Sequence, residues 1–218
     1  MKIYPAILSD ELQVVQNQLD MAMNFDDCAT VQIDLIDGFF VDNLTVTPAD
    51  LADCEFGELT VDFHIMAIDP EDVVNEIVEY TSQLPVRAII GQVEKMGNEH
   101  SFVEIVRRHG WQAGMSLDVD TDLESIDTAI WRELQVVQVM GVPAGEQGQA
   151  FVKRSLDLVD QIVRLRQEHH LGFELVVDGG IRPALLETLA HHHVDSGTVG
   201  SFIWQHAEPA QAWQEITR

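Results

Sequence analysis

Eight short β-rich runs alternate with helical patterns along the chain, and no other feature of the sequence limits the fold as strongly. The β-rich runs cover residues 3–8, 31–36, 59–64, 86–90, 112–117, 134–140, 173–177 and 196–199. Helical patterns follow at roughly residues 9–24, near 48, at 69–80, 98–109 and 121–130, in a long segment ending near 169, at 183–192, and from 209 onward. This alternation is typical of a parallel sheet covered by helices. Eight units in 218 residues favour a closed (β/α)8 barrel over an open doubly wound sheet, which normally needs fewer units. We therefore predict an α/β fold with a single TIM-barrel domain over residues 1–218.

The charge of the chain limits its partners. It carries 37 acidic and 12 basic residues, a formal net charge of -25. Such a field repels nucleic acid and anionic membranes, so we expect neither as a partner. No secretory signal and no apolar stretch of membrane-spanning length are visible. Cys28 and Cys54 lack metal-like spacing and are expected to be buried thiols, which is typical of a cytoplasmic protein.

Polar residues stand where most of the predicted strands end. In a TIM barrel these ends surround the functional site. The residues at the ends are Ser9, Asp34, His64, Gln92, Met140, Asp178, Gly200 and Ser201. We expect these side chains to lie around one mouth of the barrel.

Asp178 is followed directly by Gly179 and Gly180. A carboxylate is costly to bury, so Asp178 should stand where its strand emerges into a site. Two glycines let the backbone turn sharply and bring N–H groups close to an anion, and the following helix begins near Pro183. The alternative is a tight strand-to-helix turn capped by an aspartate.

Several segments together resemble the ribulose-phosphate 3-epimerase family, and they follow in family order over nearly the whole chain. They are PAILS at 5–9, IDLIDGFFVDNLT at 33–45, DFHIM at 62–66, the stretch 140–151, VDGGI at 177–181 and GS at 200–201. The resemblance implies a TIM barrel that inverts the carbon next to the ketone of a ketose 5-phosphate through a metal-stabilised enediolate. It assigns the proton transfers to Asp34 and Asp178, one on each face of that carbon. For Asp34 the alternative is a turn aspartate, although Asp37, next to Gly38, fits that duty better.

The resemblance also implies a divalent metal (Zn, Fe, Mn or Co) held by two histidines and two aspartates. Asp34, His64 and Asp178 match three of these ligands, whereas Gln32 stands where the family has its other histidine. An amide oxygen is a poorer ligand than imidazole, so metal binding should be weakened, and a metal-free site is the alternative. His64 would then donate a hydrogen bond to the developing oxyanion. Gln92 occupies a further position that is usually histidine.

A phosphate site is implied on the neighbouring loops. The family's glycine loop falls on Gly145 and Gly148, with Gln147 in place of another glycine and Glu146 expected to point to solvent. The alternative is that this loop is only mobile. Phosphate contacts also fall on Gly179, Gly180, Gly200 and Ser201, and sugar contacts on Ser9 and His64. Met66 and Met140 match methionines that line the family's site.

We therefore predict epimerisation of a ketose phosphate such as D-ribulose 5-phosphate, with a small phosphorylated sugar as partner and a homo-oligomeric assembly. One alternative is a barrel that binds a sugar phosphate without turning it over. Another is a different isomerase-type or aldolase-type reaction on the same scaffold. An imine-forming aldolase is disfavoured because Lys2, Lys95 and Lys153 are the only lysines and none ends a predicted strand.

Overall fold

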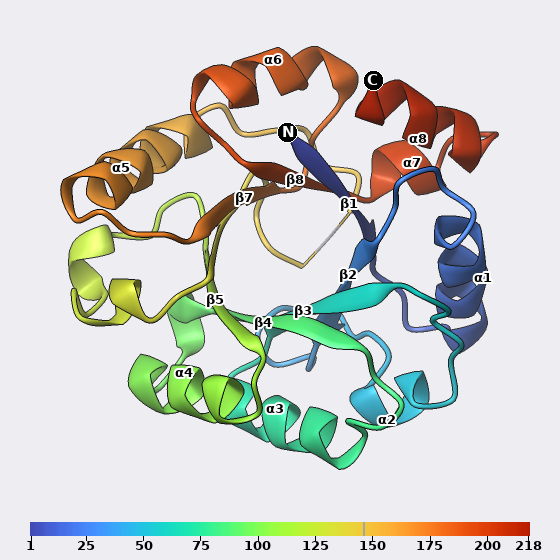
Figure 1. The fold of residues 1–218 in the computed structure, drawn as a ribbon, viewed down its shortest axis with the longest axis horizontal. Helices are drawn as coiled ribbons and strands as arrows, with labels where there is room; N and C mark the ends of the chain where they lie inside the picture. Colours follow the sequence, from blue (N-terminus) through green and yellow to red (C-terminus); the bar gives the residue numbers. More distant parts are fainter. Residues whose placement is uncertain (146) are drawn as a thin grey trace.

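Eight parallel strands close into a barrel in sequence order, with helices as the outer ring (Figure 1). The computed structural model describes residues 1–145 and 147–218. The expectation for Glu146 therefore lies outside the described residues. The strands are β1 (Lys2–Ile7), β2 (Thr30–Ile36), β3 (Thr60–Met66), β4 (Val86–Gln92), β5 (Gln112–Leu117), β6 (Val136–Met140), β7 (Glu174–Asp178) and β8 (Ser196–Val199). The predicted TIM barrel is confirmed.

The connections after the strands hold the helices. These are α1 (Leu12–Ala22), α2 (Pro48–Leu51), α3 (Pro70–Glu79), α4 (Glu99–Arg108), α5 (Ser155–Glu168), α6 (Pro183–His191), α7 (Ser201–Trp204) and α8 (Pro209–Thr217). Short 3-10 turns are η1 (Val93–Lys95), η2 (Leu123–Ser125) and η3 (Ile130–Arg132). None of the helices built from the described residues has the length and apolar character needed to cross a membrane.

The helix predicted over residues 121–130 is wrong. Only η2 and η3 form between β5 and β6. The Asp122 carboxylate accepts a hydrogen bond from the Glu124 N–H, and the Asp127 carboxylate accepts one from the Ala129 N–H. Aspartates that bind nearby backbone in this way compete with helix formation. The turn α7 was not predicted from the sequence.

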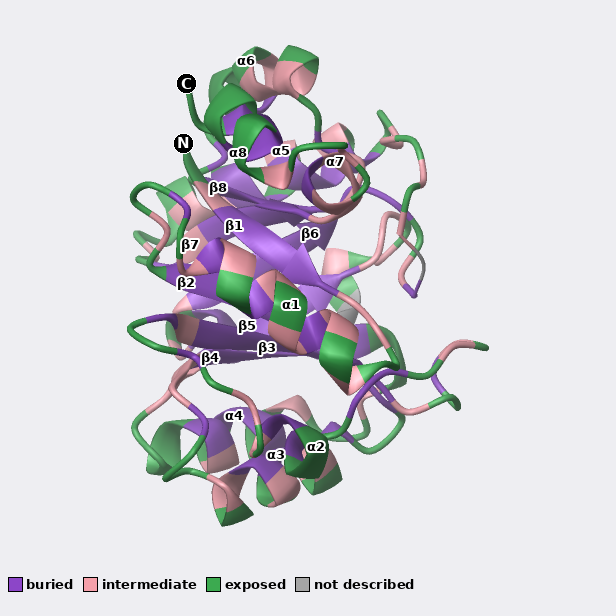
Figure 2. Cartoon of the chain, turned by 90° about the vertical axis from the view of Figure 1, so that its right-hand side faces the viewer, coloured by how far each residue is buried: buried purple, intermediate pink, exposed green. Residues whose placement is uncertain are grey.

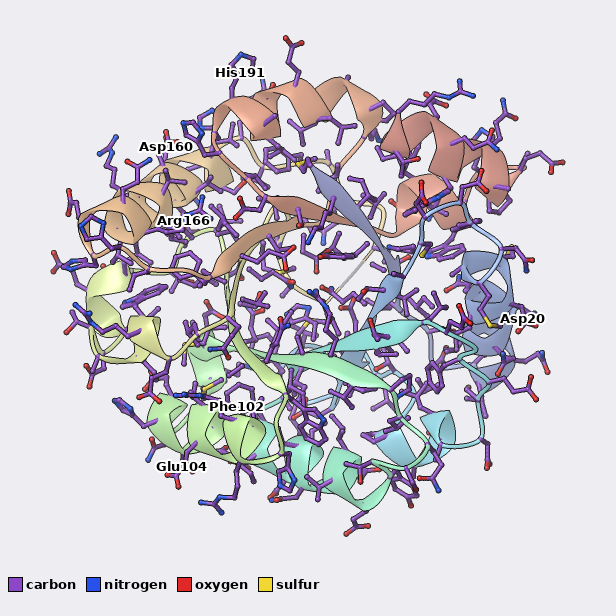
Figure 3. The ribbon with its side chains drawn as sticks, viewed as in Figure 1. Asp20, Phe102, Glu104, Asp160, Arg166 and His191 are labelled. Carbon is purple, nitrogen blue, oxygen red and sulfur yellow. The ribbon has the colours of Figure 1, made fainter. Side chains whose placement is uncertain are left out.

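Buried apolar residues of the strands and the helices pack together between the helices and the outside of the barrel. Figure 2 shows strands that are mostly buried and helices that carry both buried and exposed residues. Helix α4 shows the pattern: Phe102, Val103 and Val106 are buried, whereas Glu104 is exposed. Figure 3 shows Phe102 on the barrel side of α4 and Glu104 on its outer side. Burial of this stripe fixes the helix on the strands and so holds the strand ends in place.

The inside of the barrel carries polar groups at both ends. Alternation of side chains puts Glu174, Val176 and Asp178 on one face of β7. Glu174 joins a cluster with Arg87 at the N-terminal end, where the Arg87 guanidinium also binds Asp62. Val176 belongs to a small apolar layer with residues of β4 and β6. Asp178 joins the polar cluster at the opposite end.

Candidate active site

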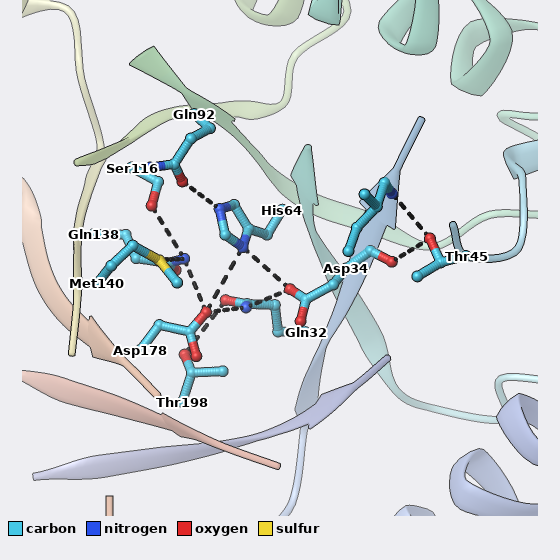
Figure 4. A network of polar contacts seen from close by, with 11 residues as sticks. Gln32, Asp34, Thr45, His64, Gln92, Ser116, Gln138, Met140, Asp178 and Thr198 are labelled. Atoms are coloured by element: carbon cyan, nitrogen blue, oxygen red, sulfur yellow. Dashed lines mark hydrogen bonds and ion pairs between the residues drawn. The ribbon is translucent and has the colours of Figure 1, made fainter. Parts of the chain in front are cut away.

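Three buried ionisable residues meet at the C-terminal end of the barrel. Asp34 on β2 and His64 on β3 are direct neighbours in the strand register, and Asp178 is the last residue of β7. Asp34 and Asp178 are each 6% exposed and His64 is fully buried. The His64 Nδ1 atom lies 3.1 Å from Asp34 Oδ1 and 3.6 Å from Asp178 Oδ2 (Figure 4). Their facing atoms all lie within 4.8 Å of one another, which is a spacing that suits a metal ion.

Gln32 joins the two carboxylates. It lies two residues before Asp34 and therefore on the same face of β2. Its Nε2 donates to Asp34 Oδ1 at 2.9 Å and to Asp178 Oδ2 at 2.7 Å. Its Oε1 accepts from the Thr198 hydroxyl at 3.3 Å. The amide therefore presents N–H groups to both acids in this structure.

The amide of Gln92 determines which ring nitrogen of His64 carries a hydrogen. The Gln92 Nε2 donates to Glu94 Oε2 at 2.7 Å, which turns the Gln92 Oε1 toward His64 Nε2 at 2.9 Å. This arrangement assigns a hydrogen to His64 Nε2. The Nδ1 atom therefore faces the two carboxylates either with a second proton or with a lone pair that can hold a cation.

The ionisation of the cluster is strongly perturbed. The pKa of Asp178 is raised to about 7, first by burial and then by the charge of Asp34, while His64 and the hydrogen bond from Gln32 act in the opposite direction. Burial alone would lower the pKa of His64, but the hydrogen bond and charge of Asp34 and the charge of Asp178 raise it overall. Interacting groups of this kind titrate as a unit. The site can therefore accept or release a proton near neutral pH.

Gln138 also forms a hydrogen bond with Asp178, and this role was not predicted from the sequence. This buried residue of β6 donates from Nε2 to Asp178 Oδ2 at 3.0 Å. The same Nε2 lies 3.4 Å from the Ser116 hydroxyl. The only available signal was a lone amide in the apolar run of β6.

Glycine-rich loops form a small cavity directly above the acids. Its lining includes both aspartates, Met66, Met140, Gly145, Gln147, Gly148, Gly179, Gly180, Gly200 and Ser201, and its volume is about 40 Å³. Gly180 has a φ of +69°, and a Cβ there would lie 2.6 Å from the backbone nitrogen of Phe151. Only glycine fits this close approach. The cavity lining thus includes all six glycine and serine positions expected at the phosphate.

Two loops are tied together beside this cavity. The Asn43 side chain donates to the Gly145 carbonyl at 2.7 Å. Asp37 accepts N–H groups of Phe39 and Phe40, as its expected turn role requires. The Lys95 ammonium donates to the backbone carbonyl of Phe39, so this lysine is occupied in holding the loop.

Among the described residues, two predicted site residues do not line the cavity: the fully buried His64, and Ser9. The Ser9 hydroxyl accepts the Glu11 N–H at 3.0 Å in the turn before α1. A larger cavity, of about 860 Å³, lies at the opposite end of the barrel beside Tyr4, Thr30 and Trp213. Size alone does not mark the reacting end, because the acids converge above the C-terminal ends of the strands.

The sequence comparisons agree with this geometry. A sequence model described as the Ribulose-phosphate 3 epimerase family matches residues 2–204. The chain belongs to this family. It is 24% identical over 218 residues to the ribulose-phosphate 3-epimerase of Bacillus subtilis (strain 168), covering 99% of this chain and 97% of that protein. It is 25% identical over 206 residues to the enzyme of Helicobacter pylori (strain J99 / ATCC 700824), covering 94% and 91%. The resemblance drawn from the sequence is confirmed, and the chain is a divergent member of this epimerase family.

Solved structures with a similar fold include other TIM-barrel proteins. The 3-hexulose-6-phosphate synthase from Salmonella typhimurium has a TM-score of 0.70 at 16% identity, covering 100% of this chain and 97% of that one. A mutant tryptophan synthase alpha-subunit from Pyrococcus furiosus has a TM-score of 0.72 at 14% identity, covering 99% and 97%. At these identities the likeness shows the fold alone.

Proposed function

We propose that this protein is a ketose-phosphate 3-epimerase that interconverts D-ribulose 5-phosphate and D-xylulose 5-phosphate or a related pair of sugars. The observation that carries the proposal is the pair of buried carboxylates, Asp34 and Asp178, that face each other across His64 beneath a glycine-lined cavity. Family membership supports the reaction class.

Inversion of the carbon beside a ketone needs two groups that act on opposite faces. One group removes a proton and the other delivers one to the other side. Asp34 and Asp178 come from β2 and β7, which are separated in the barrel by β8 and β1. A pKa of about 7 lets Asp178 serve as an acid or as a base near neutral pH. We assign one face to each aspartate, so that the two directions of the reaction exchange their roles.

The residues around the aspartates hold them in position and stabilise the enediolate. Gln32 and Gln138 fix the Asp178 carboxylate with hydrogen bonds to the same oxygen. His64, oriented by Gln92, can donate to the enediolate oxygen when Nδ1 is protonated. Met66 and Met140 give the cavity an apolar wall that limits water around the reacting carbon.

Asp34, His64 and Asp178 fit a divalent metal, because two carboxylates and one imidazole nitrogen converge within 4.8 Å. Such an ion, when bound, polarises the ketone and stabilises negative charge on the enediolate oxygen. Zn, Fe, Mn or Co suits these donors. Gln32 supplies a neutral amide where the family resemblance implies a fourth strong ligand, so we expect metal binding to be weaker than with two histidines.

The phosphate of the substrate is assigned to the glycine-rich part of the cavity. Gly179, Gly180, Gly200 and Ser201 line this part of the cavity. The Gly179 N–H is bonded to the Thr198 carbonyl, so we assign the phosphate contacts to the Gly180 N–H and to the Gly200–Ser201 segment. Neutral donors of this kind hold an anion without lysine or arginine. This accommodates a phosphate in a chain with a net charge of -25.

A second candidate is a barrel that binds a sugar phosphate but does not turn it over. The position of Gln32 favours it, because the amide fills the space between the two acids with its own N–H groups. A noncatalytic barrel would bind D-ribulose 5-phosphate and leave it unchanged with every metal.

The test is an epimerisation assay on D-ribulose 5-phosphate combined with metal analysis of the purified protein. Activity is measured after chelation and after addition of zinc, iron, manganese or cobalt. The proposal predicts turnover that is lost in Asp34→Asn and in Asp178→Asn. Binding without turnover under all five conditions would support the second candidate and overturn the first.

A further inference from the structure

Gln147 has a buried side-chain donor that is not hydrogen bonded. Its Nε2 atom has no partner among the described residues. An unsatisfied buried donor is destabilising, so native structures rarely keep one without a use. The family resemblance implies a glycine at this position, so the amide departs from the implied pattern.

The amide lies inside the glycine-lined cavity. Gln147 is packed against the bare Cα of Gly200, where an added Cβ would lie 2.8 Å from Nε2 and 3.1 Å from Cδ. Gly179, Gly180 and Ser201 line the same cavity. The donor therefore points into the space assigned above to the phosphate.

In the free protein the glycine-lined cavity is too small for a sugar phosphate. Its volume is about 40 Å³, and by this measure a water molecule needs about 10–15 Å³. A sugar phosphate enters only if lining side chains move, and the Gln147 amide that lies over Gly200 is one of them. Gly148, the next residue, has a φ of +84°, and the flexibility of a glycine there eases such a movement.

Because acidic residues line the cavity, an additional uncharged hydrogen-bond donor would help it to bind a phosphate. No lysine or arginine is among the described residues that line it, whereas both aspartates are. A phosphate must therefore be held by uncharged N–H and O–H groups against two nearby acids.

We propose that Gln147 is a phosphate-binding residue. In the free protein its amide occupies the glycine-lined cavity. When a sugar phosphate enters, the amide moves aside and donates a hydrogen bond from Nε2 to a phosphate oxygen. The inference rests on the proposed sugar-phosphate function. It assigns to this side chain a contact that a glycine at the same position cannot make.

The test measures dissociation constants of inorganic phosphate and D-ribulose 5-phosphate by calorimetry for the native sequence, Gln147→Ala and Gln147→Glu. Gln205→Ala is the matched control, because Gln205 is an exposed amide whose Nε2 approaches Gly148 at the same mouth. Thermal unfolding of every variant confirms that it is folded. We expect binding of both ligands to weaken about tenfold in Gln147→Ala, to weaken further in Gln147→Glu, and to stay within about twofold in Gln205→Ala. In the epimerisation assay the loss should fall on KM, with kcat nearly unchanged.

Two results would overturn the proposal and are distinguishable. If the native protein binds both ligands and Gln147→Ala binds them as tightly as the native protein or more tightly, the amide only fills the glycine-lined cavity and the inference is wrong. If the native protein binds neither ligand, the sugar-phosphate function fails together with the inference.

Discussion

Replacing Asp178 with asparagine is expected to stabilise the protein above neutral pH while it removes activity. The Asp178 carboxyl is 6% exposed, and its pKa is raised from 3.8 to about 7. A carboxyl with a higher pKa in the folded chain than in the unfolded chain binds its proton more tightly when folded. Its contribution therefore favours folding at low pH and is lost as the pH rises from about 4 to about 7.

The size of the effect follows from this difference. One pKa unit corresponds to about 1.4 kcal/mol, so the ionised Asp178 costs the folded state about 4 kcal/mol at pH 8. Asparagine removes that cost but weakens the hydrogen bonds that Gln32 and Gln138 donate to the carboxylate, which offsets about 1–2 kcal/mol. We expect a net gain of about 2–3 kcal/mol at pH 8 and almost none at pH 4.

Urea unfolding at pH 8 and at pH 4, with chelator present, gives both free energies of unfolding. Asp10→Asn is the control, since Asp10 is exposed and its replacement should change stability by less than about 0.5 kcal/mol. Equal stabilisation at both pH values, or none at pH 8, would refute the reasoning.

Three further predictions concern other parts of the chain. Arg87→Met should lower the free energy of unfolding by about 3–5 kcal/mol in urea at pH 7, because it leaves the buried carboxylate of Asp62 without its cation; a loss below about 1 kcal/mol would contradict this. Burial alone would raise the pKa of Asp37, but backbone N–H groups of its own loop and of Ile68 lower it overall. Asp37→Asn should therefore cost about 1 kcal/mol at pH 7, a loss that disappears as the pH falls through the lowered pKa, and a constant loss down to pH 2 would disprove it. Burial raises the pKa of Cys28 to about 11, so a thiol reagent at pH 8 should modify this residue at least about tenfold more slowly in the folded than in the unfolded protein, and equal rates would count against it.

The fold was predictable because the strands and helices differ clearly in the sequence. The run around Ile33 was predicted at 31–36 and forms β2 (Thr30–Ile36). The error at 121–130 arose because Asp122 and Asp127 bind their own backbone, a preference that a helical pattern of apolar residues does not reveal.

The site was predictable at the strand ends and much less so elsewhere. Asp34 and His64 were expected at one mouth of the barrel because both stand near the ends of predicted strands, and the register of β2 and β3 places them side by side. Gln138 could not be recognised, because its contact with Asp178 depends on how β6 and β7 are aligned in the barrel. The direction of the Gln147 amide depends on the conformation of a loop, which residue types alone do not determine.

The central claim is that Asp34 and Asp178 each transfer a proton at the carbon beside the ketone. The most direct measurement follows D-ribulose 5-phosphate in D2O by proton NMR with the native protein, Asp34→Asn, Asp178→Asn and the double variant. The account predicts that the native protein forms D-xylulose 5-phosphate with deuterium at C3 and that both single variants lose epimerisation by about 10²-fold or more. Epimerisation that survives in the double variant, or product that keeps its original hydrogen at C3, would contradict the account.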